Sequence, residues 1–126
     1  MSESCSCSCG VSCKPLLYAC SGAANTGYLS DAVARKIMGN GNGSMTCLAA
    51  VGAKLSGFVE TAKSSNNIVI DGCPTACGKK IFDTHNLDYK HIILTDFDVQ
   101  KGKTEITPDL IEKITIKVES KIQGVT

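Results

Sequence analysis

The sequence has no apolar run long enough to cross a membrane, and it has almost no net charge. Its first twelve residues carry Ser and Cys where an export signal would need an apolar core, so we expect a cytoplasmic protein. Thirteen basic and twelve acidic residues leave a net charge of +1, which gives no overall field to attract nucleic acid or an anionic membrane. We therefore expect neither of these as a partner.

Cysteine, by contrast, is abundant. The eight cysteines are Cys5, Cys7, Cys9, Cys13, Cys20, Cys47, Cys73 and Cys77. The chain has 126 residues, of which 43% are hydrophobic, so one domain can fold around its own core without disulfide bonds. Without an export signal, this cysteine content favours metal binding or thiol chemistry over a disulfide scaffold.

Composition divides the chain into two parts. Residues 1–13 alternate Ser and Cys and predict a flexible tail, whereas residues 14–126 predict a metal-binding α/β domain. The spacing Cys5-x-Cys7-x-Cys9-x-x-x-Cys13 resembles metallothionein-like segments. Such a tail would bind a soft metal ion, or it would simply be disordered.

Three short apolar segments, at 16–18, 68–70 and 91–94, predict buried strands. Five predicted helices, marked by helical spacing or helix-start signals, lie between and after these strands. The first follows the loop 21–27, and the second is capped by Ser44 and has Cys47 in its first turn. The others are 58–63, 74–84 and a helix that starts at Thr107-Pro108-Asp109. Strands separated by helices indicate a short parallel sheet covered on both faces. The predicted fold is α/β, a small three-layer Rossmann-like domain.

The segment at residues 71–77, Asp-Gly-Cys-Pro-Thr-Ala-Cys, lies between a predicted strand and a predicted helix. Pro74 suits the first turn of a helix, so we expect Cys73 to cap it and Cys77 to follow one turn later on the same face. The helix amides and dipole would favour thiolates there. Asp71 would either orient a neighbour of a sulfur atom or cap the turn.

Cys20, Cys47, Cys73 and Cys77 all fall at predicted strand ends or helix starts. Ligands of parallel sheets collect at the carboxyl ends of the strands, so these four thiols would converge. Four thiolates suit one tetrahedral zinc ion or an iron–sulfur cluster, and the cysteine count does not separate these from copper. Taken singly, Cys20 and Cys47 are equally typical of small core residues. We do not expect His85 or His91 to bind metal.

Three blocks of the sequence resemble the DGC-domain family. They are Cys20-Ser21-Gly22, Met45-x-Cys47-Leu48-Ala49 and Ile70-Asp71-Gly72-Cys73-Pro74-x-Ala76-Cys77-x-Lys79-Lys80. The blocks occur in the family's order, and the similarity runs from about Lys14 to Lys121. The family is named for its central Asp-Gly-Cys and is regarded as zinc-binding because of four cysteines. The resemblance thus implies Cys20, Cys47, Cys73 and Cys77 as ligands, with no established activity.

Thiol catalysis is the alternative. A strand, a cysteine and a small-residue loop before a helix also describe low-molecular-weight phosphatases, but these have an arginine six residues after the nucleophile, where this chain has Thr26. Sulfur or selenium transfer, or redox catalysis, by Cys20, Cys73 and Cys77 remains open. We predict a zinc-binding protein in metal or sulfur homeostasis, whose immediate role is binding rather than catalysis.

Overall fold

The computed structural model describes residues 14–124 and contains a four-stranded parallel sheet in the order β2-β1-β3-β4. The strands are β1 (Leu16–Ala19), β2 (Ser44–Met45), β3 (Asn67–Asp71) and β4 (Lys90–Ile93). The predicted tail, with Cys5, Cys7, Cys9 and Cys13, lies outside the described residues. The predicted α/β fold is confirmed, as are the three predicted strands.

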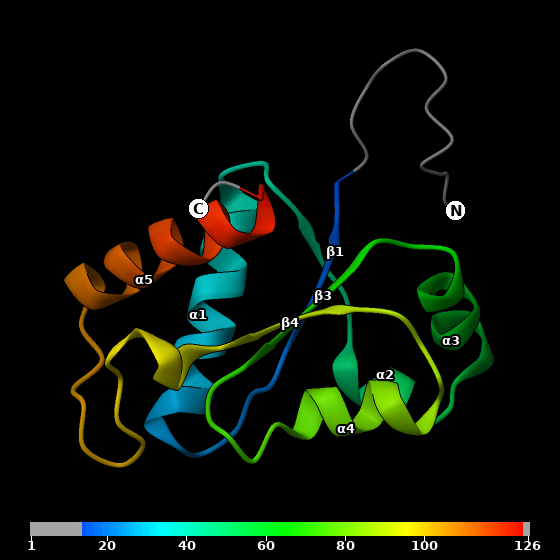
Figure 1. Cartoon of the computed structure of the whole chain (residues 1–126), viewed down its shortest axis with the longest axis horizontal. Helices are drawn as coiled ribbons and strands as arrows, with labels where there is room; N and C mark the ends of the chain where they lie inside the picture. The colour runs from blue at the N-terminus through cyan, green and yellow to red at the C-terminus, as the bar shows by residue number, and fades with distance from the viewer. Residues whose placement is uncertain (1–13, 125–126) are drawn as a thin grey trace.

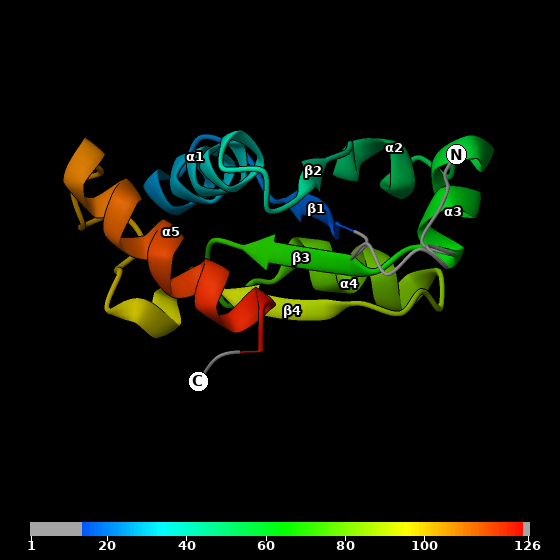
Figure 2. The same cartoon turned by 90° about the horizontal axis from the view of Figure 1, so that it is seen from above.

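Helices cover both faces of the sheet. They are α1 (Asn25–Gly39), α2 (Leu48–Gly52), α3 (Ser56–Lys63), α4 (Cys77–Thr84) and α5 (Pro108–Ile122), with a 3-10 helix, η1 (Leu94–Phe97), after β4. Figure 1 shows α1 and α5 to the left of the sheet and α2, α3 and α4 to the right, and Figure 2 shows the same separation from above. None of the helices within residues 14–124 is long and apolar enough to span a membrane.

Alternation along the strands divides the core into two clusters. Leu17, Ile68 and Ile70 pack with α1 and α5, whereas Tyr18 and Val69 face the other way and pack with α2, α3 and α4. This alternation is the ordinary consequence of successive strand side chains pointing to opposite faces. Both clusters are buried, and the carboxyl ends of β1, β2 and β3 lie in the lower part of Figure 1.

The prediction that Ser44 caps a helix is wrong. Ser44 and Met45 form strand β2, and the helix begins at Leu48 with Cys47 in the capping position. The backbone N–H groups of Ser44 and Thr46 donate to the carbonyls of Pro15 (3.0 Å) and Leu17 (3.1 Å). The free edge of β1 offers these acceptors, and satisfying backbone groups there outweighs the weak local preference for helix.

The predicted start of the next helix is also wrong. Pro74 and Cys73 lie in a turn, closed by the hydrogen bond from Ala76 N–H to the Cys73 carbonyl (3.0 Å), and α4 begins only at Cys77. Ala76 precedes it in the left-handed conformation, at φ 54° and ψ 51°. Cys77, the first residue of α4, is exposed. Asp71 sets the start of α4, because its side chain accepts hydrogen bonds from amides in the first turn of this helix.

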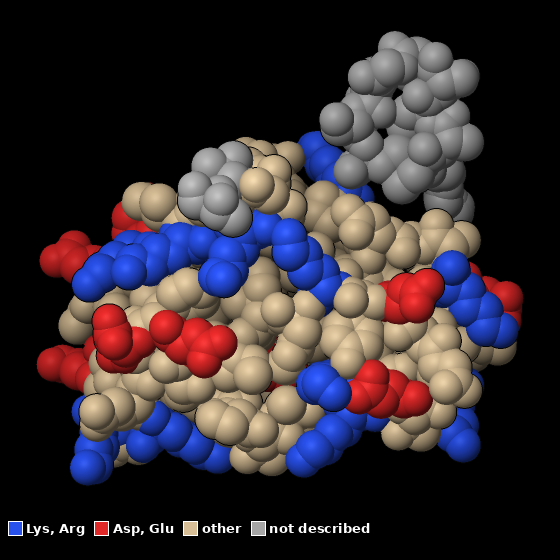
Figure 3. Space-filling model, viewed as in Figure 1, with Lys and Arg blue, Asp and Glu red and all other residues tan. Residues whose placement is uncertain are grey.

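Charges of both signs share the surface. On the face seen in Figure 3, acidic groups lie close to basic ones, and a basic band follows α5. Lys113, Lys117 and Lys121, all exposed, recur at four-residue spacing along that helix.

Candidate thiol and metal site

Cysteines follow three neighbouring strands at the carboxyl edge of the sheet. Cys20 directly follows β1, and its N–H donates to the Ile70 carbonyl of β3 at 2.9 Å. Cys73 lies two residues beyond the end of β3, and Cys47 lies two residues beyond β2 on the other side of β1. Cys77 opens α4, directly after the turn that contains Cys73. The topology therefore brings segments 53 residues apart, at Cys20 and Cys73, to adjacent strand ends.

Asp71 organises the turn between β3 and α4. Its side chain is fully buried and accepts hydrogen bonds from the N–H groups of Gly78 (2.8 Å) and Lys79 (3.0 Å). The same carboxylate pairs with Nε2 of His91 on β4 at 2.7 Å. Of the two roles that the sequence left open for Asp71, the structure shows the capping of the helix amides, a placement that the helix dipole also favours.

Glycines beside Asp71 allow the elements to approach closely. A Cβ atom on Gly72 would lie 2.4 Å from the Thr26 carbonyl oxygen in the first turn of α1. A Cβ atom on Gly78 would lie 2.6 Å from Cγ1 of Val69 and 3.0 Å from Oδ1 of Asp71. These distances are too short for any other residue, so both glycines are needed to pack the thiol-bearing turn against α1 and β3.

Cys20 is half-buried and surrounded by negative groups. Burial raises the pKa of the Cys20 thiol, and the charges of Asp71, Cys77 and Cys73 raise this pKa further, whereas the Gly72 N–H opposes them. The Ser30 hydroxyl donates to the Cys20 carbonyl and so ties this residue to α1. The effect of Cys73 and Cys77 on Cys20 shows that these three sulfurs lie within one electrostatic neighbourhood.

Cys73 has the opposite electrostatic setting. The Thr75 hydroxyl is the main group that lowers the pKa of the Cys73 thiol. Burial opposes it by raising this pKa, and the Thr75 N–H and the Lys101 ammonium make smaller contributions that lower it. Thr75 and Lys101 were not predicted as site residues. Thr75 lies within the motif, but Lys101 comes from a loop 28 residues further along the chain, and no sequence pattern connects it to Cys73.

Cys47 and Cys77 are exposed, so their side chains have room to reorient. Within residues 14–124, no group of three or more His, Cys, Asp or Glu side chains is arranged as a formed metal centre. The donor chemistry nevertheless fits a soft divalent ion, since cysteines follow three adjacent strands and the charges of Cys73 and Cys77 act on Cys20. Ligation by Cys20, Cys47, Cys73 and Cys77 stays a prediction.

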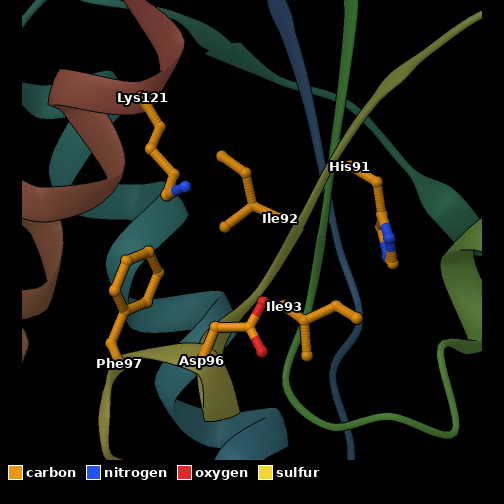
Figure 4. A pocket seen from close by; sticks show the side chains of 6 residues that line it. All are labelled: His91, Ile92, Ile93, Asp96, Phe97 and Lys121. Atoms are coloured by element: carbon orange, nitrogen blue, oxygen red, sulfur yellow. The ribbon is translucent and has the colours of Figure 1, made fainter. Parts of the chain in front are cut away.

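Both histidines have other partners. His85 Nε2 lies 2.8 Å from the Val51 carbonyl, and His91 Nε2 pairs with Asp71. A small cavity of about 110 Å³ lies beside β4, lined by His91, Ile92, Ile93, Asp96, Phe97 and Lys121. Figure 4 shows Lys121 and Phe97 on one side of β4 and the His91 ring on the other. No cysteine lines this cavity, so it is separate from the thiol site.

These features define a class of protein: a small α/β domain with cysteines that follow adjacent strands at the carboxyl edge of a parallel sheet. Residues 16–118 match the model of the DGC domain, and the chain belongs to the DGC-domain family. It is also similar to the anaerobic and virulence modulator AnvM of Pseudomonas aeruginosa, with 33% identity over 89 residues, which cover 69% of this chain and 68% of AnvM. No solved structure matches the chain.

Proposed function

We propose that this protein binds one zinc ion through Cys20, Cys47, Cys73 and Cys77 and acts in metal or sulfur homeostasis. The observation that carries the proposal is the placement of Cys20, Cys47 and Cys73 just beyond the ends of three adjacent parallel strands, with Cys77 at the start of α4. The charges of Cys73 and Cys77 also raise the pKa of the Cys20 thiol. Thiolates that repel one another at a sheet edge are relieved by a divalent cation. Cys47, at the end of the neighbouring strand, would supply the fourth thiolate of a tetrahedral set.

Groups around the cysteines are consistent with a net negative thiolate centre. Asp71 is committed to two helix amides and His91, so it would support the turn rather than bind the ion. Lys101 and the dipole of α4 would moderate the charge of about −2 that four thiolates and one divalent ion leave.

The biological setting is part of the proposal. Thiolate sites of this kind persist in a reducing compartment, which favours a cytoplasmic location. The relative AnvM is named an anaerobic and virulence modulator. A thiolate site that binds metal only while its cysteines are reduced is compatible with a regulatory role of that kind.

Elemental analysis of anaerobically purified protein tests the zinc site. The sample is the full-length chain with Cys5, Cys7, Cys9 and Cys13 changed to Ser, so that only the four remaining cysteines contribute. We expect about one zinc per chain, lost in Cys20→Ser and Cys73→Ser, with the four thiols protected from alkylation. Absence of zinc after reconstitution, or full retention of zinc in both variants, would refute the proposal.

Sulfur transfer is a second candidate, favoured by the lowered pKa of the Cys73 thiol. The Cys73 thiolate would attack the outer sulfur of a low-molecular-weight persulfide, forming a Cys73 persulfide and releasing the carrier as a thiolate. Cys20 would then attack the inner sulfur, forming a Cys20–Cys73 disulfide and releasing hydrosulfide, and a low-molecular-weight thiol would reduce that disulfide.

Mass spectrometry of metal-free protein treated with glutathione persulfide tests this second candidate. We expect the Cys73 persulfide to accumulate in Cys20→Ser, because the resolving thiol is missing, and to be absent in Cys73→Ser. Equal modification of the exposed Cys47 and of Cys73 would show unselective reaction and would reject sulfur transfer.

A further inference from the structure

A cavity of about 250 Å³ lies between α2 and α4, on the face of the sheet opposite α1 and α5. Figure 1 shows these two helices next to each other at the lower right. Their N-terminal ends carry Cys47 and Cys77, whereas the cavity lies toward their C-terminal ends. No cysteine lines the cavity, so it is separate from the thiol site. Its lining residues are Gly52, Lys54, Lys80, Ile81, Thr84 and His85.

The cavity has two lysines and no acidic residue. Lys54 follows α2, and Lys80 belongs to α4. Neither lysine has an ion-pair partner within residues 14–124. The acid of α4, Asp83, is engaged elsewhere, because its carboxylate binds the Lys79 ammonium (2.8 Å) and the Tyr89 hydroxyl (2.7 Å). Two positive charges therefore border one small space without a counter-charge.

The two lysines are not needed to cap the helix ends. At the end of α2, backbone N–H groups donate to the carbonyls of Ala50 and Val51, both at 3.0 Å, and Nε2 of His85 lies 2.8 Å from the Val51 carbonyl. At the end of α4, backbone N–H groups donate to the carbonyls of Ile81 (3.3 Å) and Phe82 (3.0 Å). Lysine side chains near a helix C-terminus ordinarily bind such carbonyls. Here other donors already do so, which leaves both ammonium groups available to a ligand.

The backbone of Lys54 is left-handed, at φ 62°. Just after a helix end, this conformation is usually adopted by glycine, because a side chain is strained there. The other non-glycine residues with positive φ in residues 14–124 are Ala76, in the thiol turn, Asn86 and Asp98. Asn and Asp tolerate this conformation, but lysine does not. A residue that breaks a local preference in this way is expected at a functional site.

We propose that this cavity binds a small phosphomonoester, and that Lys54 and Lys80 bind its phosphate group. A phosphate monoester carries a charge of about −1.5 to −2 at pH 7, which matches two ammonium groups, whereas a carboxylate matches only one. Lysine binds phosphate as a point charge. The Ile81 side chain in the cavity wall offers an apolar surface to the organic part of the ligand. The volume of the cavity suits a small molecule.

NMR titration of isotope-labelled, full-length protein with phenyl phosphate at low salt tests the proposal. Backbone amide shifts locate the site, and their concentration dependence gives the Kd. Benzoate is the matched control ligand, because it has the same ring but a single negative charge. We expect shifts at residues 52–54 and 80–85, and weaker binding of benzoate than of phenyl phosphate.

Lys80→Gln should weaken the binding of phenyl phosphate about tenfold, the loss expected for one hydrogen bond to a charged group. Lys117→Gln removes the same charge from an exposed position on α5 and should leave the Kd unchanged. Lys54→Gly should also weaken binding about tenfold. The same substitution should raise the urea midpoint of unfolding, because glycine relieves the left-handed backbone. This variant therefore separates a binding role of Lys54 from a structural one.

Unchanged binding in Lys54→Gly or Lys80→Gln, or an equal loss in Lys117→Gln, would overturn the proposal. Benzoate bound as tightly as phenyl phosphate, or no shifts at about 10 mM phenyl phosphate, would do the same. A lower urea midpoint in Lys54→Gly would show that the lysine is retained for stability, which also contradicts the proposal. The experiment does not depend on the zinc site, because no cysteine lines the cavity.

Discussion

Asp71 shows how one buried side chain determines local structure. Its carboxylate is fully buried, and its partners are two helix amides and one imidazole. Buried charges are tolerated only when hydrogen bonds replace the lost water, and these three contacts meet that requirement. The Asp of the Asp-Gly-Cys motif therefore acts here on the shape of the turn, and through it on the position of Cys73 and Cys77.

Replacing Asp71 with Asn should lower the free energy of unfolding by about 2 kcal/mol, because an amide cannot accept the same set of hydrogen bonds. Urea denaturation of metal-free protein measures the change. Asp88→Asn is the control: the Asp88 side chain is exposed, and we expect a change below about 0.5 kcal/mol. A value for Asp71→Asn as small as that of the control would contradict the capping role.

Tyr18 provides a pH-dependent test of the core. Burial raises the pKa of the Tyr18 phenol from 10.0 to about 12, and its ring packs edge-on against Phe82 with centroids 4.7 Å apart. The folded state favours the neutral phenol, so its contribution to stability is complete below pH 10 and is lost as the pH rises toward 12.

The free energy of unfolding of metal-free protein should fall by about 2 kcal/mol across this window because of Tyr18 alone. Tyr18→Phe should show a smaller fall, whereas Tyr28→Phe, at a residue that is 55% exposed, should behave like wild type. Denaturation series at several pH values measure this. Identical pH profiles for Tyr18→Phe and wild type would show that Tyr18 does not control alkaline stability.

At the scale of elements, the close approach of α1 to the turn after β3 determines the positions of the cysteines. The turn contacts α1 at Gly72, and α4 contacts β3 at Gly78. Two glycines thus set the separation of three elements, and this separation fixes the turn with Cys73 beside the strand end that carries Cys20. Small displacements here would move the sulfurs apart, since packed elements shift as units.

Gly72→Ala should lower the free energy of unfolding by at least about 2 kcal/mol, because its Cβ would lie 2.4 Å from the Thr26 carbonyl oxygen. Gly57→Ala, within α3 and with no atom within 4 Å of the added Cβ, should instead raise it by about 0.5–1 kcal/mol. Thermal and urea denaturation measure both variants. Equal effects of the two substitutions would contradict the close packing at Gly72.

At the scale of the whole molecule, the site joins strands that are distant in sequence. Cys47, Cys20 and Cys73 follow three adjacent strands, so a shared ion would link β2, β1 and β3. An ion that binds only the folded state stabilises it by mass action.

Zinc at about one hundred times its Kd should raise the free energy of unfolding by about 2.7 kcal/mol, and a chelator should reverse the effect. The N-terminal cysteines are replaced by Ser in this experiment, as above. Cys47→Ser should leave the stability of metal-free protein within about 0.5 kcal/mol, since Cys47 is exposed, but should reduce the increment from zinc. An undiminished increment in Cys47→Ser would remove Cys47 from the ligand set.

The sequence by itself determined the elements with strong periodicity. Strands at 16–18, 68–70 and 91–94 follow from buried apolar runs, and α5 follows from Thr107 and Pro108, where the Thr107 hydroxyl accepts from the Leu110 N–H at 3.1 Å. Membership in the DGC-domain family was likewise visible in the cysteine blocks. These features depend on contacts between residues close in the chain, which a linear pattern records.

Tertiary structure alone decided the remaining features. Strand β2 exists because β1 has a free edge, α4 begins where Asp71 accepts hydrogen bonds from its first amides, and Asn25 fixes a loop about 77 residues away in sequence. Each depends on a single hydrogen-bonding group that meets its partner only after the sheet has formed. No local periodicity encodes these contacts, because they form between polar groups that long-range packing buries and brings together.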